Sequence, residues 1–517
     1  MSDLRALFRD SSHYLTGQVA ALALGFVSFP IFTRVLSVAE YGMLCLTLQI
    51  AAMATVLSKM GLQNSIQRFY QEHAASTEAG ALRRFYSTVL FGASLCALSV
   101  VFLFVVGLEL VPGSLLSPVF RKVLLLGSLL IFTRGMQPIV MNFLRAQRRT
   151  KAFNIYDVLA KAISIGFVCV LVFTWNRSVN AVLIGTVSVE LVSVMLLVVL
   201  LLPRDVVSLG AFDQRLFSAA LVFGFPLVGY ELAGVILDTG DRVLVQHYLG
   251  FQAVGYYSAG YNMANYIAMS LMSPVNLALF PIYMKLWTTK GVEETRAFLS
   301  SALDKFMMAA LCILAAVSVT ARDAVIVLGS RKLEKAYPLL PVLVLGLMIY
   351  SLHIFFNAGL IIHKKTLTMA KIISFSAALN VVLNVLLIPR IGLQGAAVAT
   401  LLSYAVFLGL IVRASSTVLP LRMDFRASLR YVGAAAVSAL LASRFQFSSE
   451  FISLAVRGSL SVLLYGAVLW VIDRGFREAA NGAVGYVSDC FRKASWRSEL
   501  TTVPAVEVEV VEVGSER

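Results

Sequence analysis

Long apolar stretches recur along the whole chain, each close to the length that crosses a membrane. About 30 Å of hydrocarbon requires roughly 20 helical residues, and the sequence contains runs of about that length with few charged residues. These runs are 12–33, 42–62, 85–108, 123–144, 153–174, 178–202, 216–237, 251–284, 300–321, 337–358, 367–389, 393–416, 427–443 and 451–473. They are continuously apolar and do not alternate at every second residue, so they predict helices and not the strands of a barrel.

Composition agrees with a chain that is embedded in lipid over most of its length. Of 517 residues, 59% are hydrophobic and only 14% are charged, which departs strongly from ordinary soluble domains. We therefore predict an all-α polytopic membrane protein with about fourteen transmembrane helices. The run 251–284 is too long for one straight span and contains Pro274 and Pro281, so we expect tilt, a kink or an extension into the cytoplasm.

The sequence indicates neither a cleaved signal peptide nor cysteines that form disulfides or bind metal. The first run is not followed by a small-residue cleavage site, so we expect it to remain in the mature protein. The five cysteines are scattered singly, which predicts neither a disulfide framework nor a metal site.

The distribution of Lys and Arg predicts the orientation. Loops on the N-terminal side carry 21 Lys and Arg residues, whereas loops on the other side carry 11. Because cytoplasmic loops are enriched in positive charge, both termini of this multi-pass membrane protein should be cytoplasmic. The net charge of +15 then reflects topology and contact with anionic membrane lipids. It gives no support to a nucleic-acid partner.

Two pairs of similar segments indicate an internal repeat. TRVLSVAEYG from Thr33 resembles DRVLVQHYLG from Asp241, and RRTKAF from Arg148 resembles KKTLTM from Lys364. Their offsets are nearly equal, so we expect two six-helix lobes in the same orientation, with an axis along the membrane normal. Chance similarity in a Leu- and Val-rich chain is the alternative.

This repeat sets the expected domain boundaries. They are a cytoplasmic N-terminus at 1–11, an N-lobe at 12–210, a C-lobe at 211–416, two additional spans within 417–473, and a cytoplasmic tail at 474–517 that is part interfacial helix and part disordered.

Several motifs in a fixed order resemble a known group of transporters. SFPIFTRVLSVAEYG (28–42), LDTGDRVLVQHYLGFQAVGYYSAGYNMA (237–264), MSPVNLALFPIY (272–283) and IPRIGLQGAAVATLLSY (388–404) resemble segments of the bacterial polysaccharide flippases. These belong to the multidrug/oligosaccharidyl-lipid/polysaccharide (MOP) exporter superfamily. The resemblance covers roughly residues 10–420, and none of its motifs is catalytic.

The resemblance implies a V-shaped transporter that moves an undecaprenyl-pyrophosphate-linked oligosaccharide between leaflets, for exopolysaccharide, capsule or O-antigen synthesis. Polymerase and chain-length proteins of the same pathway are then expected partners. A drug or cation antiporter and a lipid II flippase of the same superfamily are alternatives. A membrane glycan polymerase or ligase is disfavoured because the outer loops are short and carry no carboxylate pair or His cluster. We expect no enzyme activity and no cofactor.

Cationic residues at membrane depth are candidates for contact with the substrate. Ionisable groups in hydrocarbon are energetically costly and usually face a cavity or a partner. A pyrophosphate head group crosses the membrane only where cationic side chains neutralise it. The candidates are Arg134, Lys59 and Lys161, with Arg34, Arg242 and Arg68 near the ends of spans. Arg134 is central in its run and has no acid within one turn, so we expect it to contact pyrophosphate.

Each of the other two central cations has a structural alternative. Asp157 and Lys161 are spaced i, i+4, and they can simply form a local ion pair. Lys59 lies near the end of its run and can extend to the membrane surface.

Other polar residues suggest sugar contacts and energy coupling. Tyr257, Tyr261 and Asn265 share one helix face that can stack on sugars, although an interfacial aromatic belt explains them as well. Glu190, Glu231 and Asp157 are candidate groups for H+ or Na+ coupling. The alternative is that these carboxylates satisfy partners within the bundle.

Overall fold

The computed structural model describes residues 20, 23–78, 80–114, 116–147, 149–201 and 207–478. Within them there are no strands, and every predicted apolar run has a helical counterpart, which confirms the all-α polytopic fold class. Eleven helical stretches are long and apolar enough to cross a membrane, and Gln214–Thr289 contains two of the predicted runs. The predicted N-terminus 1–11, the start of the first run, Arg148 and tail residues 479–517 lie outside the described residues.

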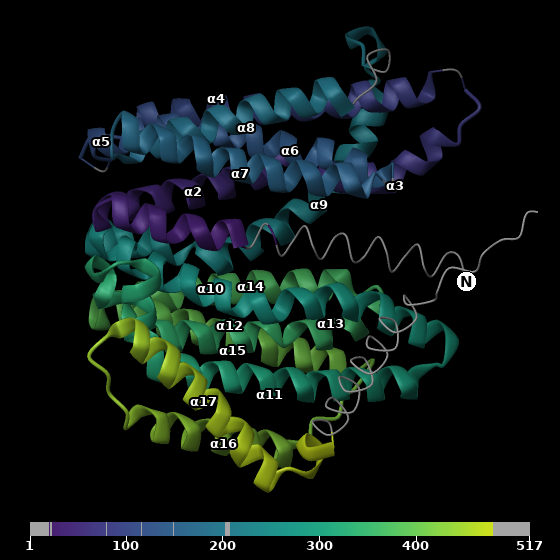
Figure 1. Ribbon diagram of the computed structural model, residues 1–517. Helices are drawn as coiled ribbons and strands as arrows, with labels where there is room; N and C mark the ends of the chain where they lie inside the picture. Colours follow the sequence, from purple (N-terminus) through teal and green to yellow (C-terminus); the bar gives the residue numbers. More distant parts are fainter. Residues whose placement is uncertain are drawn as a thin grey trace, which may run out of the picture.

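The first half of the chain forms one layer of helices, the upper one in Figure 1. A helix at Ala23–Val35 precedes α2 (Val38–Lys59), α3 (Leu62–Ala74), α4 (Ala81–Leu110), α5 (Pro118–Gly127), α6 (Leu129–Ala146), α7 (Thr150–Thr174) and α8 (Val179–Leu201). Ser37 and Glu40 start α2 with a capping box, in which each side chain bonds the other's backbone N–H.

The second half forms the other layer. Its elements are η2 (Leu209–Ala211), α9 (Gln214–Thr239), α10 (Asp241–Thr289), α11 (Val292–Ala324), η3 (Val325–Gly329), η4 (Arg331–Leu339), α12 (Leu340–Ser351), α13 (His353–Ile362), α14 (Thr366–Ile391) and α15 (Leu393–Ser416). The additional helices α16 (Phe425–Ser443) and α17 (Glu450–Ile472) pack on each other and on α11. They lie at the lower edge of Figure 1.

The long run around Pro274 and Pro281 forms a single helix that is longer than the thickness of the membrane hydrocarbon. The backbone leaves helical geometry at Gly250, where φ is 80° and only glycine is unstrained. From Phe251 to Thr289 the helix continues through both prolines, and at 1.5 Å per residue it is about 58 Å long. The helix is therefore longer than about 30 Å of hydrocarbon, which is compatible with the expected tilt or extension, and the main break in helical geometry precedes the prolines.

The two lobes share one hydrophobic core at one end and separate at the other. A single cluster joins α2, α5 and the first half of α8 to α10, α12 and α15. The far ends of α6 and α8 form a different cluster with α3, α4 and Ala220 of α9. We call the shared-core end the joined end, at the left of Figure 1, and the other the α3 end. This arrangement is the V shape that the sequence resemblance implies.

Helix α9 belongs to both lobes. Its first half lies in the core of the N-lobe, where Ser65 donates a hydrogen bond to the backbone oxygen of Ala220. Its second half contributes Ala233 and Leu237 to the shared core. The predicted boundary at 211 assigns all of α9 to the C-lobe, so the packing divides this helix differently from the sequence repeat.

Glycines allow the backbones of the two lobes to touch at the joined end. A Cβ atom on Gly42 of α2 would lie 2.1 Å from the backbone oxygen of Phe251, and one on Gly255 of α10 would lie 2.1 Å from that of Val38. Neither separation is sterically possible. The absence of side chains at both positions therefore sets how closely α2 approaches α10.

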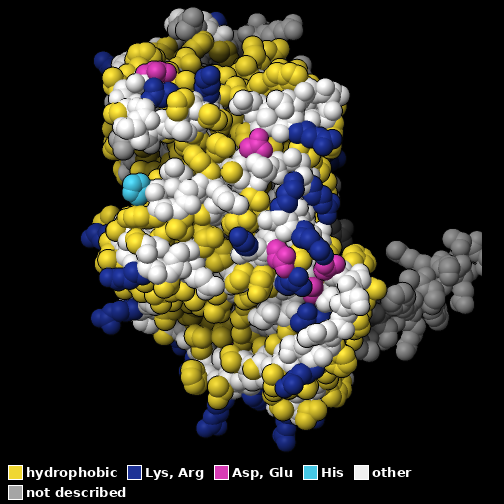
Figure 2. Space-filling model, turned by 90° about the vertical axis from the view of Figure 1, so that its left-hand side faces the viewer, with side chains coloured by type: hydrophobic (Ala, Val, Ile, Leu, Met, Phe, Trp, Pro, Cys, Tyr) yellow, Lys and Arg dark blue, Asp and Glu magenta, His cyan; other side chains and the backbone are white. Residues whose placement is uncertain are grey.

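Polar contacts reinforce this closure. Arg34 donates from Nη2 to the backbone oxygen of Val327 at 2.8 Å, and Lys332 donates back to the oxygen of Arg34 at 3.1 Å. Tyr266 and Asn262 of α10 also bond the N-lobe, at the oxygen of Gly25 and the hydroxyl of Tyr41. Figure 2 views the joined end and shows charged side chains gathered on part of it, beside broad apolar surface.

Candidate functional site

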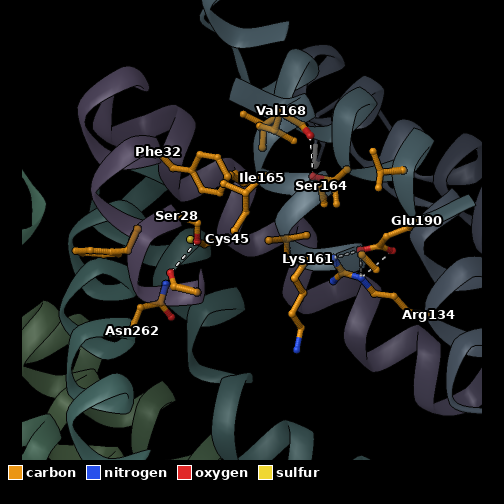
Figure 3. A pocket seen from close by; sticks show the side chains of 18 of the residues that line it. Ser28, Phe32, Cys45, Arg134, Lys161, Ser164, Ile165, Val168, Glu190 and Asn262 are labelled. Atoms are coloured by element: carbon orange, nitrogen blue, oxygen red, sulfur yellow. Dashed lines mark hydrogen bonds and ion pairs between the residues drawn. The ribbon is translucent and has the colours of Figure 1, made fainter. Parts of the chain in front are cut away.

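A cavity of about 500 Å³ lies between the first helix, α2, α6, α7 and α8, and α10 closes one side. We call it the N-lobe cavity. Apolar side chains such as Phe29, Phe32 and Val168 make up much of its lining, together with a few polar groups. Figure 3 shows Arg134 and Glu190 on one side of this cavity and Asn262 on the other.

Arg134 lines the N-lobe cavity but is not alone there. Its Nη2 lies 2.9 Å from Oε1 of Glu190, its Nε lies 3.1 Å from the same oxygen, and Thr133 donates to Oε2 at 2.8 Å. The sequence has no acid within one turn of Arg134, and the partner comes instead from the neighbouring helix α8. Both side chains remain partly exposed, Arg134 by 31% and Glu190 by 21%, so the guanidinium is still open to a ligand.

Lys161 lines the same cavity from α7. Its Nζ lies 2.9 Å from Oδ2 of Asp157 one turn earlier, so the local ion pair considered from the spacing is formed. About half of the Lys161 side chain is exposed, and it extends away from the Arg134–Glu190 pair in Figure 3. The cavity therefore presents two cations from neighbouring helices, each with one carboxylate.

A second cavity of about 600 Å³ adjoins the first toward the α3 end. We call it the polar chamber, and Gln137 lines both spaces. It is lined by Lys59, Gln63, Asn64, Gln67, Gln137, Pro138, Met141, Asn142, Arg145, Phe153, Asp157, Leu227, Tyr230 and Glu231. Five of these residues are amides, which is an unusual concentration for the interior of a chain that is 59% hydrophobic.

An ion pair between Lys59 of α2 and Glu231 of α9 crosses the polar chamber. Gln63 adds a hydrogen bond to the same carboxylate at 3.1 Å. The Lys59 side chain is only 11% exposed, so it does not extend to the membrane surface, which was the structural alternative for this residue. Lys59, a candidate for substrate contact, and Glu231, a candidate for ion coupling, therefore form an ion pair with each other.

We predict that exchanging these charges restores function that either single reversal removes. Lys59→Glu or Glu231→Lys places like charges together and should impair transport strongly. The neutral variant Glu231→Gln should lower the free energy of unfolding by only about 1 kcal/mol, since Glu231 stays partly exposed. The double exchange should recover most of the transport. Exchange within the Glu293–Arg296 pair of α11, which lines neither cavity, is the matched control and should leave transport unchanged. Failure of the Lys59–Glu231 exchange to rescue would contradict the pairing role.

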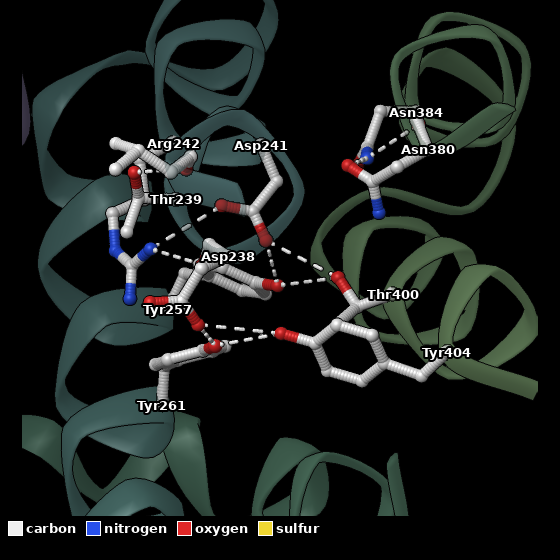
Figure 4. Close-up of polar contacts among 11 residues, drawn as sticks. Asp238, Thr239, Asp241, Arg242, Tyr257, Tyr261, Asn380, Asn384, Thr400 and Tyr404 are labelled. Carbon is white, nitrogen blue, oxygen red and sulfur yellow. Dashed lines mark hydrogen bonds and ion pairs between the residues drawn. The ribbon is translucent and has the colours of Figure 1, made fainter. Parts of the chain in front are cut away.

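Tyr257, Tyr261 and Arg242 do not face either cavity, contrary to expectation. They are buried in the C-lobe, where Tyr257 donates to Asp241 at 2.5 Å and the Arg242 guanidinium lies 4.3 Å from the Tyr261 ring centroid. Figure 4 shows this network joining α9, α10 and α15. The i, i+4 face therefore packs inward, and a different face of α10, with Asn262 and Tyr266, reaches the N-lobe cavity.

The same network contains residues that the sequence did not indicate. Asp238 accepts hydrogen bonds from Tyr261 and from Tyr404 at 3.3 Å, and Thr400 donates to Asp241 at 3.2 Å. The predicted spans end at 237 and resume at 251, which assigned both aspartates to a loop. Across the described part of the chain, no cluster of three His, Cys, Asp or Glu side chains suits a metal ion.

The remaining candidates also lie outside the described cavities. Arg34 bonds the backbone of η3 at the joined end. Arg68 is exposed on α3, with its guanidinium 5.8 Å from the ring centroid of Phe69, and Asn265 is partly buried on α10. None of the three lines the N-lobe cavity or the polar chamber.

Known structures share this architecture. The lipid II flippase MurJ in an inward closed conformation matches with a TM-score of 0.70 and 14% identity, covering 89% of this chain and 99% of that one. An inward-facing multidrug resistance MATE transporter of the MOP superfamily matches with a TM-score of 0.57 and 14% identity. This match covers 83% of this chain and 96% of the transporter chain. The uncharacterized membrane protein MJ1068 of Methanocaldococcus jannaschii is 26% identical over 255 residues, and the match spans about half of each chain.

Two lobes of membrane helices around polar cavities therefore give this chain the fold of the lipid II flippase and of the MATE transporter. Residues 7–287 match the polysaccharide biosynthesis protein family. The chain belongs to that family.

Proposed function

We propose that this protein flips a lipid-linked oligosaccharide, carried on undecaprenyl pyrophosphate, from the cytoplasmic to the periplasmic leaflet of the inner membrane. The product serves exopolysaccharide, capsule or O-antigen synthesis, alongside polymerase and chain-length proteins. The observation that carries the proposal is the pair of cations, Arg134 and Lys161, in a cavity that is otherwise largely apolar. An anionic head group on a long hydrocarbon tail requires that combination.

The alternatives fit the cavity less well. A cationic drug favours an excess of carboxylates, but the N-lobe cavity is lined by two cations, Arg134 and Lys161, and by one carboxylate, Glu190. A lipid II flippase would use the same phosphate chemistry, and the family match to polysaccharide biosynthesis supports an oligosaccharide as the substrate.

Deleting the gene tests directly which of these substrates the protein carries. The lipid-linked glycan that accumulates on the cytoplasmic leaflet identifies the substrate, and accumulation of lipid II alone would refute the proposal.

Coupling to H+ or Na+ is proposed to act through ion-paired carboxylates. Glu190 and Glu231 each neutralise one cation in the cavities. Neutralising Glu231 with a proton or a cation would release Lys59 and loosen α9 from α2. Such a change converts a gradient into a conformational preference, because a ligand shifts an equilibrium only through differential affinity for two states.

We propose that the joined end faces the periplasm and that both chain ends face the cytoplasm. The excess of Lys and Arg on the N-terminal side supports this orientation, which makes the present conformation open toward the cytoplasm. A reporter enzyme that is active only in the periplasm should be inactive when fused after residue 478. Full activity of that fusion would show that the C-terminus lies in the periplasm and would contradict the proposed orientation.

A further inference from the structure

The polar chamber has a chemistry distinct from that of the N-lobe cavity. Its charges are already neutralised, since Glu231 pairs with Lys59 and Asp157 pairs with Lys161. The remaining cation, Arg145 at the rim, lies with its guanidinium 4.4 Å from the ring centroid of Phe153. An ion entering the chamber would therefore find no unpaired carboxylate, and its one further cation is already stacked on a ring.

The amides differ from the charged groups, because several of them keep unused hydrogen-bonding atoms. Gln63 donates to Glu231 through Nε2, but its Oε1 atom is buried without a hydrogen-bond partner in the described part of the chain, and the residue is only 8% exposed. Asn64, Gln67 and Gln137 line the chamber and make no side-chain hydrogen bond to any described residue. A buried polar atom without a partner is destabilising, so the Gln63 oxygen favours a ligand that supplies a donor. The partly exposed Asn64 and Gln137 and the exposed Gln67 can add further donors and acceptors.

We infer that the polar chamber binds the neutral sugars of the glycan, while the N-lobe cavity holds the pyrophosphate and the start of the lipid tail. An amide donates and accepts at once, which matches hydroxyl groups and N-acetyl groups that also do both. Tyr230 in the lining offers a ring face for the apolar face of a sugar ring. The volume of about 600 Å³ lies within the range of small-molecule sites.

The contact between the two spaces supports this division. Gln137 lies one turn after Arg134 on α6 and lines both cavities, so a head group can reach from one to the other without leaving protein. The inference rests on the proposed function, since it divides one lipid-linked glycan between two subsites.

Site-specific photocrosslinking in the native host tests the division. A benzophenone amino acid replaces Gln67 in the chamber or Ile165 in the N-lobe cavity, and Leu159 on the lipid-facing side of α7, which is 53% exposed, serves as the control. After irradiation, mass spectrometry of the purified full-length protein identifies the captured groups. We expect neutral sugar at position 67, polyprenyl phosphate at 165 and only bulk lipid at 159.

The outcomes separate the inference from the proposed function. Lipid-linked glycan captured at 165 with no sugar at 67 would overturn the chamber assignment alone. Absence of lipid-linked glycan at both positions would overturn the flippase proposal and the inference with it. Gln137→Leu should lower sugar capture at position 67 roughly 2- to 12-fold, the loss expected for one neutral hydrogen bond. Unchanged capture would contradict a shared contact at Gln137.

Discussion

Arg134→Gln should reduce export of the lipid-linked glycan roughly 10- to 100-fold, which is the loss expected for one hydrogen bond to a charged group. Its guanidinium projects into the N-lobe cavity and is partly exposed there, so a phosphate can share it with Glu190. Arg134→Lys should keep part of the activity, because it retains the charge but loses the bidentate geometry. Export and the amount of protein in the membrane are measured together.

The Glu190 partner requires a matched control. Arg134→Gln alone leaves the Glu190 carboxylate without its cation, so some loss of protein could be structural. The double variant Arg134→Gln/Glu190→Gln removes both charges and strands neither. If Arg134 binds phosphate, the double variant should reach the normal membrane level and still fail to export. Normal export by the double variant would show that the pair is structural.

Gly255→Val should reduce transport roughly 5- to 150-fold by forcing α2 and α10 apart at the joined end. A Cβ atom there would lie 2.1 Å from the backbone oxygen of Val38, and this atom belongs to a helix that cannot move aside alone. Overpacking of this kind typically costs about 1 to 3 kcal/mol. A penalty of that size disfavours the closed joined end by roughly 5- to 150-fold. Transport by alternating access requires that closure, so it should fall by a comparable factor.

A native cysteine reports the expected opening. Cys45 lies one turn after Gly42 on α2, is buried and lines the N-lobe cavity. In a background with its other cysteines replaced by serine, Gly255→Val should speed alkylation of Cys45 by a membrane-impermeant maleimide added outside the cell. Gly409→Val on α15 is the control, because a Cβ atom there meets nothing within 4 Å. Equal alkylation in both variants would contradict the role of the glycine contact.

The fold was predictable because its determinants are local along the chain. Continuous apolar runs specify membrane helices without reference to partners, and the described helices match those runs. The break at Gly250 was less visible, because a single glycine inside a helical pattern has several explanations. The division of α9 between two cores was not predictable, since it depends on which residues pack against Ala220 and Leu237 in three dimensions.

The candidate site was predictable only where its partners are close in sequence. The Asp157–Lys161 pair follows from i, i+4 spacing and is formed. The partner of Arg134 is 56 residues away, and that of Lys59 is 172 residues away, so no local pattern reveals either one. The spacing of Tyr257 and Tyr261 placed both on one helix face, but it did not show that this face points into the C-lobe.

Movement of the glycan lipid by the purified protein tests the central claim most directly. Lipid-linked oligosaccharide extracted from the deletion strain is incorporated into sealed vesicles with the protein, and an impermeant glycosidase outside reports which leaflet holds the glycan. The account predicts that the inner-leaflet pool becomes accessible with the natural protein and stays protected with Arg134→Gln/Glu190→Gln. Continued protection with the natural protein, in vesicles that still move lipid II or a cationic drug, would contradict it.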